Sequence, residues 1–468
     1  MRIAVPSILA NITIPLVGLV DMVIAGHISS ACAIGGIAVG SMLFDMLYGC
    51  FGFLRVSTAG LTAQAYGAHK VEECGALFAK SSAIAIAGSL LIWVLQTVYL
   101  EAVLYVLPCS QEVSVFARAY YSVRIWAAPA TLMLMTCKGW FIGMQDGTRA
   151  MVSDLVVNGV NMLASYLLAV HTPLGAIGVA WGTLIAQWIG LIVALTMIAV
   201  RYSNNFQLLK DELLISRSFE RLFLSTFNFQ LSTNKSFFRL NADLFVRSLC
   251  FIVVYVGWTT ICSSYGDVEL AASALMMKLF MLFSFFIDGF AYAGEALVGK
   301  TIGAQKSINH EIFKSSNHQL NQLIKLLFAW GTGVGVFFSL LYALFPDALF
   351  SSLTSDAEVV STMHHYLGWL IMMPIVSMLA FMWDGIFAGA TRGREIRNAM
   401  LWAAAAFALT YLVFSPELNR HLSFDFGLLT NIGSHAVYAA YFAHLAARVI
   451  YLTVRYLRLD ILRSVSPE

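Results

Sequence analysis

Twelve apolar runs, each about as long as a membrane-spanning helix, account for most of the chain. A helix needs about 20 apolar residues to cross the hydrocarbon core of a bilayer. Of the 468 residues, 59% are hydrophobic and only 12% are charged, against about 25% charged in soluble domains. The sequence therefore predicts an all-α polytopic membrane protein with 12 transmembrane helices. The runs lie near 3–26, 33–60, 78–106, 114–142, 150–170, 175–199, 240–264, 270–298, 320–350, 364–390, 396–415 and 432–455.

The basic residues between the runs predict the orientation of the chain. Lysines and arginines gather in alternate loops, in the long segment 200–239 and in the tail after residue 454, with Arg420 as the exception. Loops rich in Lys and Arg stay on the cytoplasmic side. We therefore expect both termini in the cytoplasm and the protein in the cytoplasmic (inner) membrane. The first run carries no A-x-A cleavage site, so we expect it to remain as a span.

An internal repeat relates the two halves of the chain. Residues 33–70 align without a gap on 269–306 at a constant offset of 236, which places Gly67 on Gly303. Halves with six spans each share one orientation, and duplicated bundles of this kind are a transporter design. We predict an N-lobe at 1–199, a cytoplasmic linker at 200–235 and a pseudo-symmetric C-lobe at 236–468. Within the linker, LLISRSFERLFLSTF is expected to form an amphipathic helix at the membrane surface.

Asp21 is the one ionisable side chain in the run 3–26. A carboxylate at membrane depth costs about 2.5–3.5 kcal/mol, so it persists where it is paired, hydrated, protonated or functional. Asn158 and Asn161 lie one helical turn apart in a later run. Such amides either hold helices together or orient a carboxylate on a neighbouring helix. For Asp21, which has no basic partner in its own run, we favour a cation-coupling role.

The second half contributes further intramembrane charges. Asp243 and Arg247 have the i, i+4 spacing that allows a direct pair on one helix. Asp288 and Glu295 lie seven residues apart and share a helix face, with Lys278 close to that face. These three either line a polar cavity or neutralise one another.

Lys138 in the first half and Asp384 in the second occupy matching positions in KGWFIG and DGIFAG. They either pair with each other, or one of them contacts the substrate or an ion. Four further charges in the spans are expected to form buried ion pairs or to reach the membrane interface. These are Asp45, Arg118, Arg124 and Asp154.

Several function classes are disfavoured by what the sequence lacks. The net charge of +2 gives no electrostatic footprint for nucleic acid. The sequence shows no phosphate-binding loop and no soluble domain, which argues against an ATP-driven pump. The histidines are scattered, which argues against an enzyme. The seven cysteines show no metal-ligand spacing, so no metal or other cofactor is expected. A disulfide between Cys32 and Cys109, which fall in loops on the same side, stays open because spacing cannot establish its geometry.

The chain resembles the multidrug and toxic compound extrusion (MATE) family, and within it the DinF-like branch, over its whole length. The resemblance rests on PLVGLVDMVIAGH (15–27), GLTAQAYGA (60–68), GWFIGMQDGTR (139–149), RLNADLFVRSL (239–249), KLFMLFSFFIDGFAYAGEALVGKTIGAQ (278–305) and DGIFAGATRGREIRN (384–398). It implies a two-lobed antiporter that works by alternating access and exports amphipathic, often cationic organic compounds, without enzyme activity and as a monomer in the lipid bilayer. The small organic substrates and the membrane lipid are its expected partners.

The resemblance also assigns roles to particular residues. Asp21 matches the family's titrating carboxylate, and Asn158 or Asn161 matches its asparagine partner. Ser165 stands where many relatives carry a second acid, which favours proton coupling. Asp384 matches the second-lobe acid of sodium-linked relatives, with Asp243 as a substitute for their missing glutamate, so Na⁺ coupling is an alternative. A flippase for a lipid-linked precursor is the other alternative, for which we expect a more basic cavity.

Overall fold

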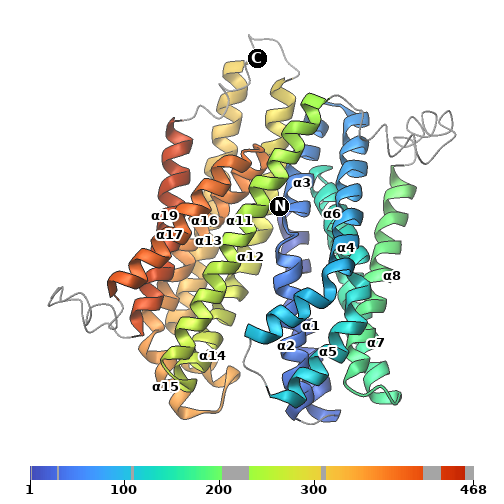
Figure 1. Cartoon of the computed structure of the whole chain (residues 1–468). Coiled ribbons are helices and arrows are strands. Elements are labelled where there is room, and N and C mark those ends of the chain that lie inside the picture. The colour runs from blue at the N-terminus through green and yellow to red at the C-terminus, as the bar shows by residue number, and fades with distance from the viewer. Residues whose placement is uncertain are drawn as a thin grey trace. The chain divides into compact units, whose positions relative to one another are not determined.

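The computed structural model describes residues 1, 3–28, 31–106, 110–202, 231–306, 313–414 and 434–458, and these residues are almost entirely helical (Figure 1). Among them, 11 stretches are long and apolar enough to cross a membrane, and Ala4–Gly18 is a shorter apolar helical stretch at the start of the chain. The prediction of an all-α polytopic membrane protein is therefore confirmed. Most of the predicted linker, including the expected amphipathic helix, lies outside the described residues.

The chain divides into two units. Unit 1 comprises residues 1–241 and 299–307, and unit 2 comprises residues 242–298 and 308–468. The helices that fall mainly in unit 1 are α1 (Ala4–Ile28), α2 (Ala31–Gly49), α3 (Phe53–Gly67), α4 (Val71–Val106), α5 (Gln111–Arg124), the 3₁₀ turn Ile125–Ala127, α6 (Ala128–Gly143), α7 (Gly147–His171) and α8 (Ile177–Arg201). Those that fall mainly in unit 2 are α11 (Leu231–Ser264), α12 (Asp267–Lys306), α13 (Phe313–Leu344), α14 (Pro346–Leu353), α15 (Ala357–His365), α16 (Leu367–Gly389), α17 (Gly393–Phe414) and α19 (His435–Arg458).

The two copies of the repeat differ in one physical respect. The predicted helix 33–60 is broken into α2 and α3, while its copy in the second half is the unbroken α12. The break falls where Gly49 and Gly52 flank two residues, and tight i to i+3 hydrogen bonds replace the helical pattern there. Glycine weakens a helix interior, and the equivalent positions in α12 are Phe285 and Asp288.

The predicted helix 320–350 ends early. α13 stops at Leu344, and two short helices, α14 and α15, follow before α16 begins. Pro346 is the first residue of α14. Proline lacks the amide hydrogen that the helix would need at this point and clashes with the preceding turn, so the chain leaves the α13 axis instead of extending it.

Small residues bring α7 and α8 into close contact in unit 1. A Cβ atom on Gly182 would lie 2.4 Å from the backbone nitrogen of Ser165, and one on Gly178 would lie 2.6 Å from the carbonyl carbon of Leu168. Glycine at every fourth position lets two membrane helices approach this closely. The approach fixes the buried face of α7, which carries the polar residues of the candidate site.

A similar contact positions α16 in unit 2. A Cβ atom on Gly385 would lie 2.3 Å from the carbonyl oxygen of Ala291 on α12. Because only glycine allows this distance, α16 is held against α12 at the residue that follows Asp384.

Candidate functional site

Asp21 lies on α1, six residues after Pro15, and is half-buried. The side chain of Ser165 on α7 lies close to its carboxyl group. The carboxyl oxygen Oδ1 is buried and makes no hydrogen bond to a residue that the structure describes. A buried carboxylate oxygen without a donor is costly within a membrane span. This atom is therefore a candidate to hold a proton.

Asn161 reaches Asp21 through Ser165. Its amide nitrogen donates to the Thr183 hydroxyl of α8 at 3.1 Å, and its amide oxygen accepts from the Ser165 hydroxyl at 3.2 Å. Asn161 is only 5% exposed and Ser165 is fully buried. These contacts fix the orientation of the serine beside Asp21. The i, i+4 spacing of Asn161 and Ser165 is visible in the sequence, but no role beside Asp21 was predicted for the serine.

Asn158 contacts α1 directly. Its amide nitrogen donates to the Thr13 hydroxyl, which in turn donates to the carbonyl oxygen of Ala10 at 2.6 Å. Thr13 lies about two turns before Asp21 on the same helix. Asn158 therefore joins α7 to α1 as the helix-joining interpretation of these amides expects, and it holds the helix that carries the carboxylate.

Arg124 at the end of α5 supplies the positive charge that α1 lacks. Its guanidinium interacts electrostatically with both Asp21 and Asp45. It also donates to the Tyr120 hydroxyl at 3.0 Å and lies 4.7 Å from the centre of the Phe44 ring. We call Asp21, Asp45 and Arg124 the unit 1 charge set. We expected Arg124 and Asp45 to be structural, because the sequence gives them no obvious function.

Lys138 pairs with Asp154 of α7 in the same unit. The lysine therefore has a carboxylate partner within its own unit. Arg118 likewise pairs with Glu101. Asp154 thus forms a partly buried ion pair, as expected, whereas the pair of Arg118 with Glu101 is exposed.

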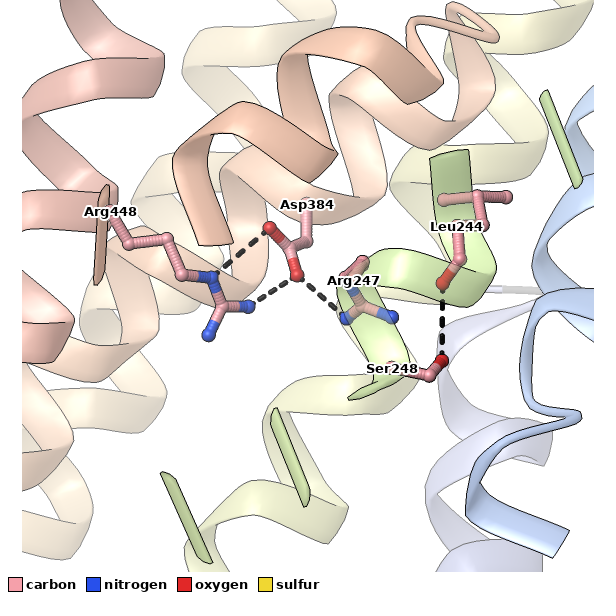
Figure 2. A network of polar contacts seen from close by, with 5 residues as sticks. All are labelled: Leu244, Arg247, Ser248, Asp384 and Arg448. Carbon is pink, nitrogen blue, oxygen red and sulfur yellow. Dashed lines mark hydrogen bonds and ion pairs between the residues drawn. The ribbon is translucent and has the colours of Figure 1, made fainter. Parts of the chain in front are cut away.

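Asp384 lies between two arginines in unit 2 (Figure 2). Arg247 of α11 donates to Oδ2 at 2.9 Å, and Arg448 of α19 donates to both carboxylate oxygens, with 3.3 Å between its Nε and Oδ1. Arg448 is nearly buried, whereas the Arg247 side chain is 27% exposed. We call these three residues the unit 2 triad. It ties α11, α16 and α19 together and holds one more positive than negative charge.

The expected direct pair between Asp243 and Arg247 is wrong. Asp243 instead forms an ion pair with Arg397 of α17, and Arg247 turns to Asp384. Residues at i and i+4 share a helix face, but neighbouring helices offered each of them a partner of its own. Each of the two charges is thus paired with a residue of another helix, and these ion pairs both neutralise the charges and hold the helices together.

Asp288 and Glu295 both lie on α12, as their spacing predicted, but not in one environment with Lys278. Glu295 is 1% exposed and Asp288 is half-buried, while Lys278 is exposed. The structure therefore does not gather the three as one buried set. The disulfide considered between Cys32 and Cys109 lies outside the described residues, which include neither the Cys32 side chain nor Cys109. The cysteines at 50, 74, 137, 250 and 262 are free.

Known sequences resemble this chain over most of its length. The MatE family model matches residues 6–167 and 244–415. DNA damage-inducible protein F of Escherichia coli K12 is 31% identical over 423 residues, which cover 90% of this chain and 86% of that protein. Human multidrug and toxin extrusion protein 1 is 22% identical over 390 residues, or 83% of this chain and 64% of that protein.

Solved structures share the fold. A multidrug resistance MATE family transporter of the MOP superfamily, in an outward-facing conformation, matches with a TM-score of 0.80 at 15% identity, over 99% of this chain and 96% of that one. A MOP superfamily transporter from Pyrococcus furiosus, described as having a binding pocket of reverse polarity, matches with a TM-score of 0.78 at 14% identity, over 100% and 96% of the two chains.

Proposed function

Because the chain belongs to the MatE family of multi-pass membrane transporters, we propose that it is a proton-coupled antiporter that exports amphipathic, often cationic organic compounds from the cytoplasm. Export of small organic compounds is the activity of the family, and the chain acts as a transporter and not as an enzyme. We propose in particular that the coupling ion is a proton, that the substrate carries a positive charge and that a single copy of the chain works alone.

The observation that carries the proposal is the unit 1 charge set. With both carboxyl groups ionised, two negative charges face the single positive charge of Arg124, so the set has a net charge of −1. Protonation of Asp21 leaves Asp45 and Arg124 balanced. A cationic substrate and a proton therefore compensate the same excess negative charge. Binding of the proton favours release of the cation, and binding of the cation favours release of the proton.

This competition gives an exchange cycle. A proton from the outer side neutralises Asp21, weakens the attraction for a bound cation and so releases it outward. The proton leaves when the site next faces the cytoplasm. Each pH unit across the membrane supplies about 1.4 kcal/mol per proton, and each 100 mV supplies about 2.3 kcal/mol per charge. One or two protons per cycle are therefore sufficient for useful export.

The unit 2 triad supports protons over sodium. Hard cations bind several oxygen ligands, but both oxygens of Asp384 accept hydrogen bonds from guanidinium groups. A sodium ion bound there would have to displace two arginines. The second-lobe sodium site is therefore disfavoured, and Asp21 is the better candidate for the coupling carboxylate.

Reconstituted liposomes test the coupling ion directly. The purified protein is given a fluorescent organic cation and either an imposed pH gradient in sodium-free buffer or a sodium gradient at equal pH. The proposal predicts dye accumulation under the pH gradient alone. Accumulation that requires the sodium gradient would overturn it.

One observation favours a second function. The triad carries a net charge of +1, from two arginines and one carboxylate, and an anionic group would compensate that charge. For a flippase of a lipid-linked precursor we expected a more basic cavity with several arginines, and the triad supplies two arginines. In the same liposomes, gradient-driven movement of a lipid-linked pyrophosphate without any dye flux would put the flippase first.

A further inference from the structure

A pocket of about 540 Å³ opens in unit 2 among α13, α16 and α19, and its lining residues include none of the unit 2 triad. Most of its lining residues belong to α13, and their helical spacing shows that they lie on one face of that helix. The lining residues are His318, Asn321, Gln322, Ile324, Lys325, Phe328, Trp383 and Tyr456. Proton-coupled export assigns no role to any of them.

The pocket combines an aromatic wall with a polar rim. Trp383 packs edge-on against Phe328, with 4.9 Å between ring centres, and its ring centre lies 4.8 Å from that of Tyr456. On the rim, the Tyr456 hydroxyl donates to Asn321 at 2.9 Å. Lys325 is exposed. No acidic side chain is among the lining residues that the structure describes, so the charge of this lining favours an anion.

The pocket lies at one end of its helices. Its α13 residues fall within the first half of a helix that begins at Phe313, and Tyr456 belongs to the last turn of α19, which ends at Arg458. The distribution of Lys and Arg places these helix ends on the cytoplasmic side. Tyr and Trp are typical of the membrane interface, and basic pockets between membrane helices on the cytoplasmic side bind lipid head groups.

We propose that this pocket binds the phosphate-bearing head group of an anionic phospholipid of the inner leaflet. Lys325 contacts the phosphate, the amides of Asn321 and Gln322 contact the polar part of the head group, and the ring of Trp383 contacts the start of the acyl chains. Trp383 precedes Asp384 directly in α16. A lipid bound here therefore braces the helix that carries the centre of the triad.

Quenching of tryptophan fluorescence by brominated lipids tests the proposal. The full-length protein is reconstituted in phosphatidylcholine vesicles that contain a small fraction of either brominated phosphatidylglycerol or brominated phosphatidylcholine. The anionic lipid should quench more strongly at equal fraction, and Trp383→Phe should remove that excess. Equal quenching by both lipids, or an excess that survives Trp383→Phe, would overturn the proposal.

Charge variants identify the contact. Lys325→Gln should reduce the preference for the anionic lipid about fivefold, as expected for one basic residue near a membrane surface, and Lys325→Arg should retain it. Lys70→Gln, an exposed lysine on the same expected side but in unit 1, is the matched control and should change nothing. A preference unchanged in Lys325→Gln would overturn the proposal. Loss of the preference on addition of inorganic phosphate would do so too, because the pocket would then bind the free anion.

Discussion

Gly67 and Gly303 occupy equivalent positions in the two copies of the repeat, and each lies against the backbone of the other's helix. A Cβ atom on Gly67 would lie 2.0 Å from the carbonyl oxygen of Lys300, and one on Gly303 would lie 1.9 Å from that of Gln64. Gln64 and Lys300 are themselves equivalent at the offset of 236. The contact between α3 and the end of α12 is therefore reciprocal, as a two-fold relation requires.

Alanine at either glycine should destabilise the protein to a similar extent. The added methyl group meets backbone atoms that cannot rotate away, so we expect Gly67→Ala and Gly303→Ala each to cost about 1–3 kcal/mol or more. Gly159→Ala on α7 is the control, since nothing lies within 4 Å of its Cβ position. Thermal unfolding in detergent measures the difference. An unfolding temperature that falls in the control and not at Gly67 would contradict the packing described here.

Ser165→Ala should lower both stability and transport. The change removes the donor to Asn161 and the hydroxyl beside Asp21, and a buried acceptor without its donor costs about 1–3 kcal/mol. Ser153→Ala, a buried serine on the same helix, is the matched control. Thermal unfolding and dye efflux are measured for both variants. Equal effects at the two serines would mean that Ser165 acts only through packing.

The unit 1 charge set predicts a rescue between two substitutions. Arg124→Gln leaves two carboxylates without their cation, and Asp45→Asn leaves no excess charge for a cationic substrate, so each should impair dye efflux. The double variant restores the net charge of −1 and should transport better than Arg124→Gln alone. Efflux by purified protein in liposomes measures all three. A double variant as poor as the worse single variant would show that net charge does not govern the site.

Asp384→Asn should unfold the protein more readily than any change at Asp21. It leaves Arg247 and Arg448 within the membrane without their carboxylate, and loss of one partner of a buried ion pair costs about 3–5 kcal/mol. Asp21→Asn removes no ion pair of this kind and should keep its unfolding temperature. If thermal unfolding ranks the two variants in the opposite order, Asp384 is not a structural centre.

The fold was largely predictable because the membrane imposes a strong length rule on apolar runs. The repeat was also visible, since the second copy keeps its register with the first. The helix break at Gly52 and the end of α13 before Pro346 were not predicted, although the glycine and the proline are visible in the sequence. A hydropathy profile averages over about 20 residues, so a single glycine or proline barely changes it.

The pairing of charges was less predictable than their presence. The sequence shows that Asp243 and Arg247 share a face, but it does not show that Arg397 and Asp384 stand opposite that face. We expected Arg124 to be structural because the sequence gives it no obvious function. Asp21 could be proposed from the sequence because a lone carboxylate stands out in an apolar run without any knowledge of its neighbours.

Asp21→Asn under an imposed pH gradient tests the central claim most directly. The variant mimics the protonated carboxyl group, and Asp154→Asn, which breaks the pair with Lys138 in the same unit, is the control. In sodium-free liposomes, pH-driven accumulation of a cationic dye should collapse in Asp21→Asn and persist in Asp154→Asn. Accumulation that persists in Asp21→Asn and still follows the pH gradient would place the coupling carboxylate elsewhere.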